Sequence, residues 1–185
     1  MFLIDKTFEF CYGHRVWTQT LDGRFSDDLK CACRHLHGHE AKVQVFLEGE
    51  TLNPHGMVTD FRHLEWLKKW LNQFIDHQFI IDINDPLFPV LFPSEKVFTE
   101  VLYLSAENSP IKYAGRLVRP MASVTENHLL EMFEGVLVVD FPPTSEHLAK
   151  WLHGLVQYKM NDLNVKVRRV DWYETPKSRS SYIAE

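Results

Sequence analysis

The sequence predicts an α+β protein in which an antiparallel sheet carries two helices on one face. Three segments, two near the N-terminus and one near the C-terminus, alternate apolar and polar side chains with the period of a β-strand. Two further segments repeat apolar side chains at helical spacing. The elements follow one another as strand, strand, helix, and later helix, strand, with hairpin-like joins, and this order favours an α+β arrangement.

The first two predicted strands bring histidines onto a buried face. The first strand begins at Thr7 and its apolar face consists of Phe8, Phe10, Tyr12 and His14. Residues 17–34 lack periodicity and are rich in turn-forming and charged residues, so we expect a connecting loop. The second strand covers residues 37–47, and one face carries His37, His39, Ala41, Val43, Val45 and Leu47. Two histidines therefore share one strand face.

Two helices are predicted from apolar spacing and capping residues. Asp60 can cap the first, which ends near Asp76 and His77. Its apolar face is Phe61, Leu64, Leu67, Leu71, Phe74 and Ile75. The second helix starts at Thr144 or Ser145, directly after two prolines. Its apolar stripe is Leu148, Trp151, Leu152, Leu155 and Val156. We expect this stripe to cover the sheet.

The closing segment predicts a last strand. Val165 and Val167 alternate, and the pattern resumes out of phase from Val170, which indicates a bulge at Arg168–Arg169. Residues 135–141 are typical of a short buried strand, whereas the rest of residues 82–140 is interrupted by prolines and predicts no clear element.

Composition excludes several classes of protein. With 185 residues, 45% of them hydrophobic, the chain is long enough for one domain with a real core. A net charge of -5 without any run of Lys or Arg argues against a nucleic-acid-binding domain. No apolar stretch is long enough to span a membrane and the first residues lack the features of a signal peptide, so we expect a cytoplasmic protein. Three cysteines make a disulfide framework improbable.

The residues best suited to chemistry lie between Cys31 and His39, where five metal-competent side chains occupy alternate positions. Strand neighbours His37 and His39 can supply two ligands, and His14 is the natural third if the first two strands pair. Three imidazoles leave a fourth position open, as catalytic zinc requires. Two alternatives remain open at this stage. The histidines can be ordinary partly buried residues, or Cys31 and Cys33 can complete a closed structural zinc site.

Other candidate residues are weaker when each is taken alone. Asp76 and His77 place a carboxylate beside an imidazole at a helix end, which equally suits a histidine that interacts with the helix dipole. Glu174 is an acid before a Thr-Pro turn. Thr144, Ser145 and Glu146 read first as a helix cap with an acidic first turn.

Six motifs in a fixed order resemble a known family. They are FEFCYGHRV, C-x3-HGH, G-x3-DF, DH, PTSE, and ETP with a tyrosine shortly after, and they cover residues 5 to about 86 and about 136 to 182. Together they resemble the 6-pyruvoyl-tetrahydropterin synthase and 6-carboxy-tetrahydropterin synthase family. The resemblance implies the tunnelling fold, whose subunits assemble, trimer on trimer, into a barrel with active sites at subunit interfaces. It therefore implies a closed homo-oligomer, most simply a homohexamer.

The resemblance also assigns roles, position by position. It implies zinc (Zn2+) on His14, His37 and His39, in agreement with the strand-face argument. The family's nucleophile-like cysteine stands four residues before the first histidine of HGH, which is Cys33 and not Cys31. It implies that Asp76 and His77 form an acid-imidazole pair that works with that cysteine, usually across a subunit boundary. It implies that the carboxylate of Glu174 binds the pterin. It also implies a pocket wall formed by Thr144, Ser145 and Glu146.

The implied activity is that of a zinc-dependent carbon-oxygen lyase. The carboxy branch of the family converts 7,8-dihydroneopterin triphosphate into 6-carboxy-5,6,7,8-tetrahydropterin, acetaldehyde and triphosphate, for queuosine (7-deazaguanine) synthesis. Alternatives are the sibling 6-pyruvoyl-tetrahydropterin synthase activity and a non-catalytic, zinc-stabilised pterin or purine binder. In this sequence His35 and Cys31 are extra metal-competent groups, and residues from about 87 to 135 form a long insertion in one synthase-like domain covering 1–185.

Overall fold

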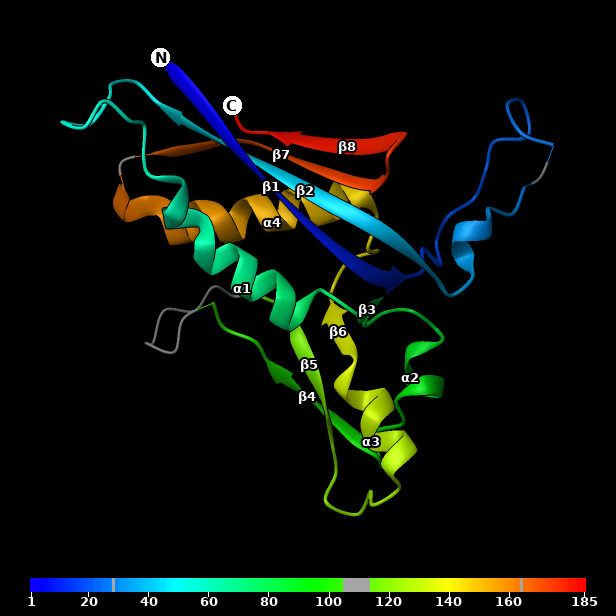
Figure 1. Cartoon of the computed structure of the whole chain (residues 1–185). Helices are drawn as coiled ribbons and strands as arrows, with labels where there is room; N and C mark the ends of the chain where they lie inside the picture. The colour runs from blue at the N-terminus through cyan, green and yellow to red at the C-terminus, as the bar shows by residue number, and fades with distance from the viewer. Residues whose placement is uncertain (28, 105–113, 164) are drawn as a thin grey trace.

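The computed structural model describes residues 1–27, 29–104, 114–163 and 165–185. One eight-stranded sheet runs through the molecule in the order β4-β5-β6-β3-β1-β2-β7-β8, and its strands are labelled in Figure 1. The two long N-terminal strands, β1 (Phe2–His14) and β2 (His37–Gly49), form an antiparallel pair at its centre. On the far side of β2 follow β7 (Lys166–Thr175) and β8 (Ser178–Ile183), both antiparallel. The loop joining β1 and β2 contains one short 3-10 helix, Ala32–Arg34.

The sheet is mixed, which corrects the expectation of a fully antiparallel one. β3 (Gln78–Asp82) pairs parallel with the end of β1, and β6 (Val136–Val139) pairs parallel with β3. Each parallel pair follows a crossover connection that contains helical structure, as parallel strands require. Residues 136–139 are buried on both faces of the sheet, which confirms the predicted short strand.

Two helices cover the same face of the central strands in Figure 1, as the sequence predicts. A 3-10 turn, Phe61–Leu64, capped by the Asp60 side chain, leads into α1 (Glu65–Phe74). Helix α4 (Ser145–Met160) begins at the N-cap Thr144, whose hydroxyl accepts from the backbone N–H of His147. Trp70 of α1 and Trp151 of α4 are in ring contact at 5.6 Å, so the two helices share one core.

One residue of the predicted helix face is misplaced. Phe61 is 49% exposed, although the sequence pattern puts it on the apolar face with Leu64. The reason is that Phe61 opens a 3-10 turn, in which the side chains advance by one third of a turn per residue and leave the phase of the following α-helix.

The predicted bulge in the last long strand is confirmed. Phe46 of β2 faces Arg169 and the next residue, Leu47, faces Val167, so Arg168 is the extra residue. The bulge keeps Val167 and Val170 buried although they are three positions apart. Strand β8, which the sequence analysis did not predict, follows the turn after Thr175 and forms one edge of the sheet.

The insertion continues the same sheet beyond β6. It contains α2 (Phe88–Leu91), the antiparallel hairpin of β4 (Val97–Val101) and β5 (Arg116–Pro120), and α3 (Asn127–Glu134). The part of the insertion at 105–113 lies outside the described residues. A second apolar cluster, including Ile81, Phe133 and Val138, packs this region against β3 and β6. Within the part of the chain that the structure covers, no helix has the length and apolarity needed to cross a bilayer.

Candidate metal centre and pterin site

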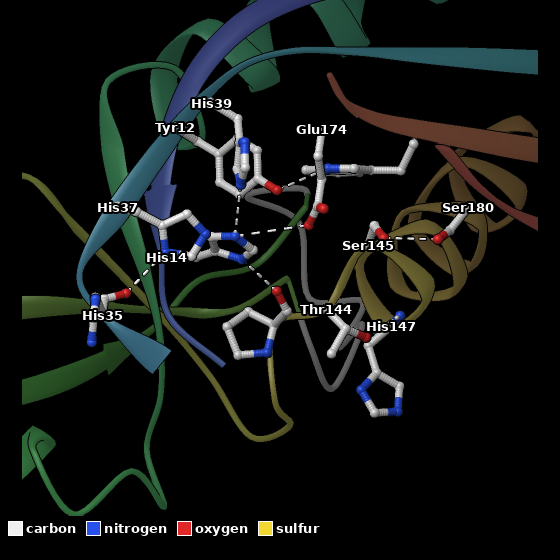
Figure 2. Close-up of polar contacts among 12 residues, drawn as sticks. Tyr12, His14, His35, His37, His39, Thr144, Ser145, His147, Glu174 and Ser180 are labelled. Carbon is white, nitrogen blue, oxygen red and sulfur yellow. Dashed lines mark hydrogen bonds and ion pairs between the residues drawn. The ribbon is translucent and has the colours of Figure 1, made fainter. Parts of the chain in front are cut away.

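Three histidines converge where β1 ends and β2 begins. His14 and His37 are directly opposite each other in the antiparallel pair, and His39 lies two residues further on the same face. The ring centroids are 4.5 Å (His14–His37), 5.1 Å (His14–His39) and 4.9 Å (His37–His39) apart. Figure 2 shows the three rings gathered to the left of the Glu174 carboxylate. The geometry expected from the strand patterns is therefore present.

Backbone carbonyls fix the orientation of two of these rings. His14 Nδ1 lies 2.7 Å from the carbonyl oxygen of Pro143, and His37 Nδ1 lies 2.9 Å from that of His35. Because a carbonyl only accepts, each Nδ1 carries the proton and leaves the Nε2 lone pair free. Such a second hydrogen bond is the usual support for a metal-ligating imidazole. Buried His37 Nε2 has no hydrogen-bond partner, as expected of an atom that awaits a metal.

Two of the histidines, His14 and His39, are also held in the neutral form that binds metals. His14 is 1% exposed, and burial, helped by His37 and His39 and opposed by the Pro143 hydrogen bond, lowers its pKa to about 4. Burial, and then His37, lowers the pKa of His39. One ligand atom from each of the three residues lies within 4.8 Å of the others. The cluster can therefore hold a metal ion.

Neither cysteine belongs to this cluster. In the described residues, the group with metal-binding spacing consists of the three histidines alone, which does not favour a closed Cys-His structural site. Cys33 lies in the 3-10 turn of the β1–β2 loop, where its carbonyl accepts from the backbone N–H of Val16. Burial, then hydrogen bonding and charge from Cys31, then the charge of Glu174, raise the pKa of Cys33 to about 11. Without a metal, the groups of this chain therefore raise the pKa of Cys33 rather than lower it.

Glu174 approaches the histidines from β7. Its Oε1 lies 3.7 Å from His14 Nε2, and its side chain is 24% exposed. Burial first, and then the charge of Glu146, raise the pKa of Glu174, while His37 and the Tyr12 hydroxyl act in the opposite direction. A carboxylate held in a partly buried position with few protein donors is suited to a ligand that brings its own N–H groups.

The start of α4 forms the wall beside Glu174. The Ser145 hydroxyl lies 2.7 Å from that of Ser180 on β8 (Figure 2). Burial would raise the pKa of Glu146, but its own backbone N–H and the Thr144 and Ser180 hydroxyls bond the carboxylate, and the net effect is a lowered pKa. Thr144, Ser145, Glu146 and Glu174 thus lie together, as the sequence analysis expected.

Asp76 and His77 lie elsewhere in the same chain. Asp76 Oδ1 accepts from the Cys11 backbone N–H at 2.8 Å and lies 3.0 Å from His77 Nδ1. Cys11 is an outward-facing residue of β1, whereas His14 belongs to the buried face. His77, which has a positive φ of 61°, is 81% exposed. One chain therefore does not bring this pair together with the three histidines.

A shallow depression of about 570 Å³ lies beside His77 on that outward face. Gly13 and Gly38 are opposite each other in the β1–β2 pair and form part of its lining. Glycine at position 13 leaves room for the side chain of Phe79, because a Cβ atom there would lie 2.7 Å from that side chain. This surface is open to a neighbouring molecule.

Two contributors to the site were missed from sequence. Pro143 was read as a helix-start signal, yet its carbonyl orients His14. Tyr12 was read as an apolar residue, yet its ring contacts His14 and His39 and its hydroxyl lowers the pKa of Glu174 through a hydrogen bond (Figure 2). A polar-tipped aromatic two residues before a ligand histidine, on the same strand face, is the signal that could have revealed Tyr12.

Comparisons with known proteins agree with this geometry. The family model described as 6-pyruvoyl tetrahydropterin synthase matches residues 3–185. A protein of Aquifex aeolicus named 6-carboxy-5,6,7,8-tetrahydropterin synthase is 32% identical over 191 residues, covering 98% of each chain. A putative enzyme of the same name from Pyrococcus abyssi is 32% identical over 88% of this chain and 84% of its own.

Solved structures share the fold. An uncharacterised protein from Wolinella succinogenes matches with a TM-score of 0.83 and 42% identity, covering 100% of this chain and 98% of its own. The 6-pyruvoyl tetrahydropterin synthase of Plasmodium vivax matches with a TM-score of 0.55 and 15% identity, covering 100% and 99%, which is a likeness of fold. With a family match over almost its whole length and a named relative at 32% identity, the chain belongs to the 6-pyruvoyl tetrahydropterin synthase family.

Proposed function

We propose that this protein is a zinc-dependent lyase of the carboxy branch of its family. It converts 7,8-dihydroneopterin triphosphate into 6-carboxy-5,6,7,8-tetrahydropterin, acetaldehyde and triphosphate, a reaction of queuosine (7-deazaguanine) synthesis. The observation that carries the proposal is the cluster of three imidazoles, two of them oriented by backbone carbonyls, beside the Glu174 carboxylate. The name of the Aquifex relative, similar over 98% of both chains, favours the carboxy product over the pyruvoyl product.

His14, His37 and His39 would hold the zinc ion. Bound there, zinc acts as a Lewis acid toward the hydroxyl groups of the pterin side chain and makes the neighbouring protons easier to remove. The protein's part is to leave the Nε2 lone pairs of His14 and His37 free, which the carbonyls of Pro143 and His35 achieve, and to bring one ligand atom of each histidine within 4.8 Å of the others.

Glu174 would bind the pterin ring. A carboxylate has two oxygens that can accept from the two N–H groups of a 2-amino-pyrimidinone edge, so it fixes the orientation of the ring as well as its position. The first turn of α4 would form the adjacent wall through Thr144, Ser145 and Glu146. Glu174 and His14 lie side by side, with Oε1 3.7 Å from Nε2, so the carboxylate and the three histidines can face the same ligand.

Cys33 would act as the general base. With only the groups of one chain around it, the Cys33 thiol has a pKa of about 11. A positive charge from another source must lower this pKa before a Cys33 thiolate can accept a proton at neutral pH. A zinc ion and an imidazole are the two available sources. His77, hydrogen-bonded to Asp76, would supply the imidazole and carry the second proton.

That role requires a neighbouring subunit, because Asp76 and His77 lie on the outward face of their own chain. We therefore propose a closed homo-oligomer, a homohexamer built as a barrel, of a single domain with the insertion at about 87–135. Two features of the described sheet support assembly through strands. β1 pairs with β3 only over Tyr12–His14, so much of its length has a free edge, and β8 forms a second edge. Unpaired strand edges of this kind are usually protected by another structural element or by a neighbouring subunit.

Product analysis tests the proposal directly. The purified, zinc-loaded protein is incubated with 7,8-dihydroneopterin triphosphate, the pterin products are identified by mass, and acetaldehyde is trapped as a hydrazone. We expect 6-carboxy-5,6,7,8-tetrahydropterin and acetaldehyde in equal amounts. A pyruvoyl product without acetaldehyde would assign the sibling activity, and tight pterin binding without conversion would indicate a non-catalytic binder.

A further inference from the structure

Tyr12 is buried at the centre of the site, but the proposed reaction gives it no task. Its side chain is 3% exposed and its ring contacts both His14 and His39, at centroid distances of 5.1 and 5.7 Å. On its other side it meets Trp172 edge-on at 5.5 Å. The ring is thus held on several sides, and the place of its hydroxyl group is fixed.

The hydroxyl group of Tyr12 links two other side chains. Trp172 Nε1 donates to it at 3.2 Å. An indole N–H can only donate, so the phenol oxygen accepts there and its own proton is directed elsewhere. The Glu174 carboxylate is within hydrogen-bonding reach of this hydroxyl and can only accept when ionised. The order of donation therefore runs from the indole to the phenol and from the phenol to the carboxylate.

This chain of donors connects strands that are not neighbours. Tyr12 and His14 lie on β1, whereas Trp172 and Glu174 lie on β7, and β2 runs between the two. The hydrogen bond between the Tyr12 hydroxyl and Glu174, which contributes to the pKa of both groups, thus spans β2 and relates the position of the carboxylate to that of the histidines. Without it, the carboxylate at 24% exposure could turn toward solvent.

We propose that Tyr12 is a positioning residue, which orients the Glu174 carboxylate toward the pterin edge at a set distance from the three histidines. The proposal rests on the proposed function, since it assigns Tyr12 a role in binding the same pterin. It makes the phenol hydroxyl, rather than the ring, the part that matters for ligand affinity.

The test compares two phenol deletions. Tyr12→Phe removes the hydroxyl and keeps the ring that packs against the histidines. Tyr173→Phe, the matched control, removes a hydroxyl next to Glu174 in the chain but on the opposite face, where it contacts Gln44 at 3.4 Å. Binding of 7,8-dihydroneopterin is measured by fluorescence titration, together with zinc content and steady-state kinetics. We expect about tenfold weaker binding and a higher KM for Tyr12→Phe, with zinc content and kcat retained, and wild-type values for Tyr173→Phe.

A double-mutant cycle separates positioning from general packing. If Tyr12 acts through Glu174, the Tyr12→Phe change has no further effect on pterin binding in a Glu174→Gln background. Wild-type affinity in Tyr12→Phe, or a full tenfold loss that persists in the Glu174→Gln background, would overturn the proposal. Should Tyr12→Phe fail to fold, Trp172→Phe, which removes the indole donor, must weaken binding at least twofold for the proposal to stand.

The same experiment distinguishes failure of the proposed function from failure of the positioning role of Tyr12. If the wild-type protein itself binds no pterin, the proposed function is wrong and the positioning role is wrong with it. If the wild-type protein binds the pterin and Tyr12→Phe binds it equally well, only the role of Tyr12 is wrong.

Discussion

Replacement of Glu174 with Gln separates ligand binding from folding, because the carboxylate is expected to help one and to oppose the other. The amide keeps the size of the side chain but presents one acceptor and one misplaced donor to the two N–H groups of the pterin edge. Loss of a hydrogen-bonded charge in a binding site costs roughly 2 to 5 kcal/mol when the site is dry. The side chain is 24% exposed, so water can replace part of the lost interaction. We therefore expect a loss at the lower end of this energy range, which corresponds to a KM increase of about 30- to 100-fold.

The effect on stability should have the opposite sign. Burial, and then the neighbouring Glu146, raise the pKa of Glu174, so its ionised form is less favourable in the folded chain than in the unfolded chain. At neutral pH this linkage lowers the free energy of unfolding. Glu174→Gln removes the charge and should melt at the same temperature as the wild-type protein or higher, as found where binding groups are held at a cost in stability.

The assay combines steady-state kinetics of the zinc-loaded enzyme on 7,8-dihydroneopterin triphosphate with thermal unfolding of the metal-free protein at pH 7. Zinc content and oligomeric state serve as controls and should not change. An unchanged KM and kcat in the variant would show that Glu174 does not hold the pterin. A large drop in melting temperature would show instead that the carboxylate is a structural group, and the reasoning from its surroundings would be wrong.

Three further predictions address the metal, the base and the pH dependence of folding. His37→Ala should lose zinc, whereas His35→Ala should keep it, because His35 contributes only its backbone carbonyl to the site. Equal zinc contents of the two variants, measured by elemental analysis, would refute the ligand assignment. Cys33→Ala should keep zinc but lose about a hundredfold or more in kcat, whereas Cys31→Ala should lose far less. Equal kcat values for the two variants would show that Cys33 is not the general base. Burial lowers the pKa of His153 from its ordinary value of 6.5. As the pH falls, the unfolded chain therefore binds a proton on this imidazole before the folded chain does, and the free energy of unfolding should decrease below about pH 6.5. Urea unfolding between pH 7.5 and 5.5 should show a smaller decline for His153→Gln, and equal slopes would contradict the prediction.

Much of the central fold follows from local patterns. The alternation in β1 and β2 fixes which side chains face the core, and once the strands pair, His14 and His37 must meet. Helix α4 and the bulge at Arg168 are likewise visible, because apolar periodicity and its interruption are written in consecutive residues.

Other parts depend on contacts that no local pattern records. Strand β8 carries mainly polar residues on an edge, so it lacks the apolar alternation that marks a half-buried strand. The hairpin of β4 and β5 lies among prolines and is stabilised by the second apolar cluster, whose members come from distant segments. The sequence shows Asp76 and His77 side by side, but their place beside β1 is set by hydrogen bonds to the backbone N–H and carbonyl of Cys11.

Zinc titration of the metal-free protein tests the central claim most directly, namely that the three histidines form the metal centre of a pterin lyase. Metal is removed with a chelator and dialysis, zinc is added back in steps, and turnover of 7,8-dihydroneopterin triphosphate is measured at each step. The account predicts no turnover at the start and a linear rise that ends at one zinc per chain. Full turnover without metal, or a rise of the same size in His37→Ala at the same zinc concentrations, would contradict it.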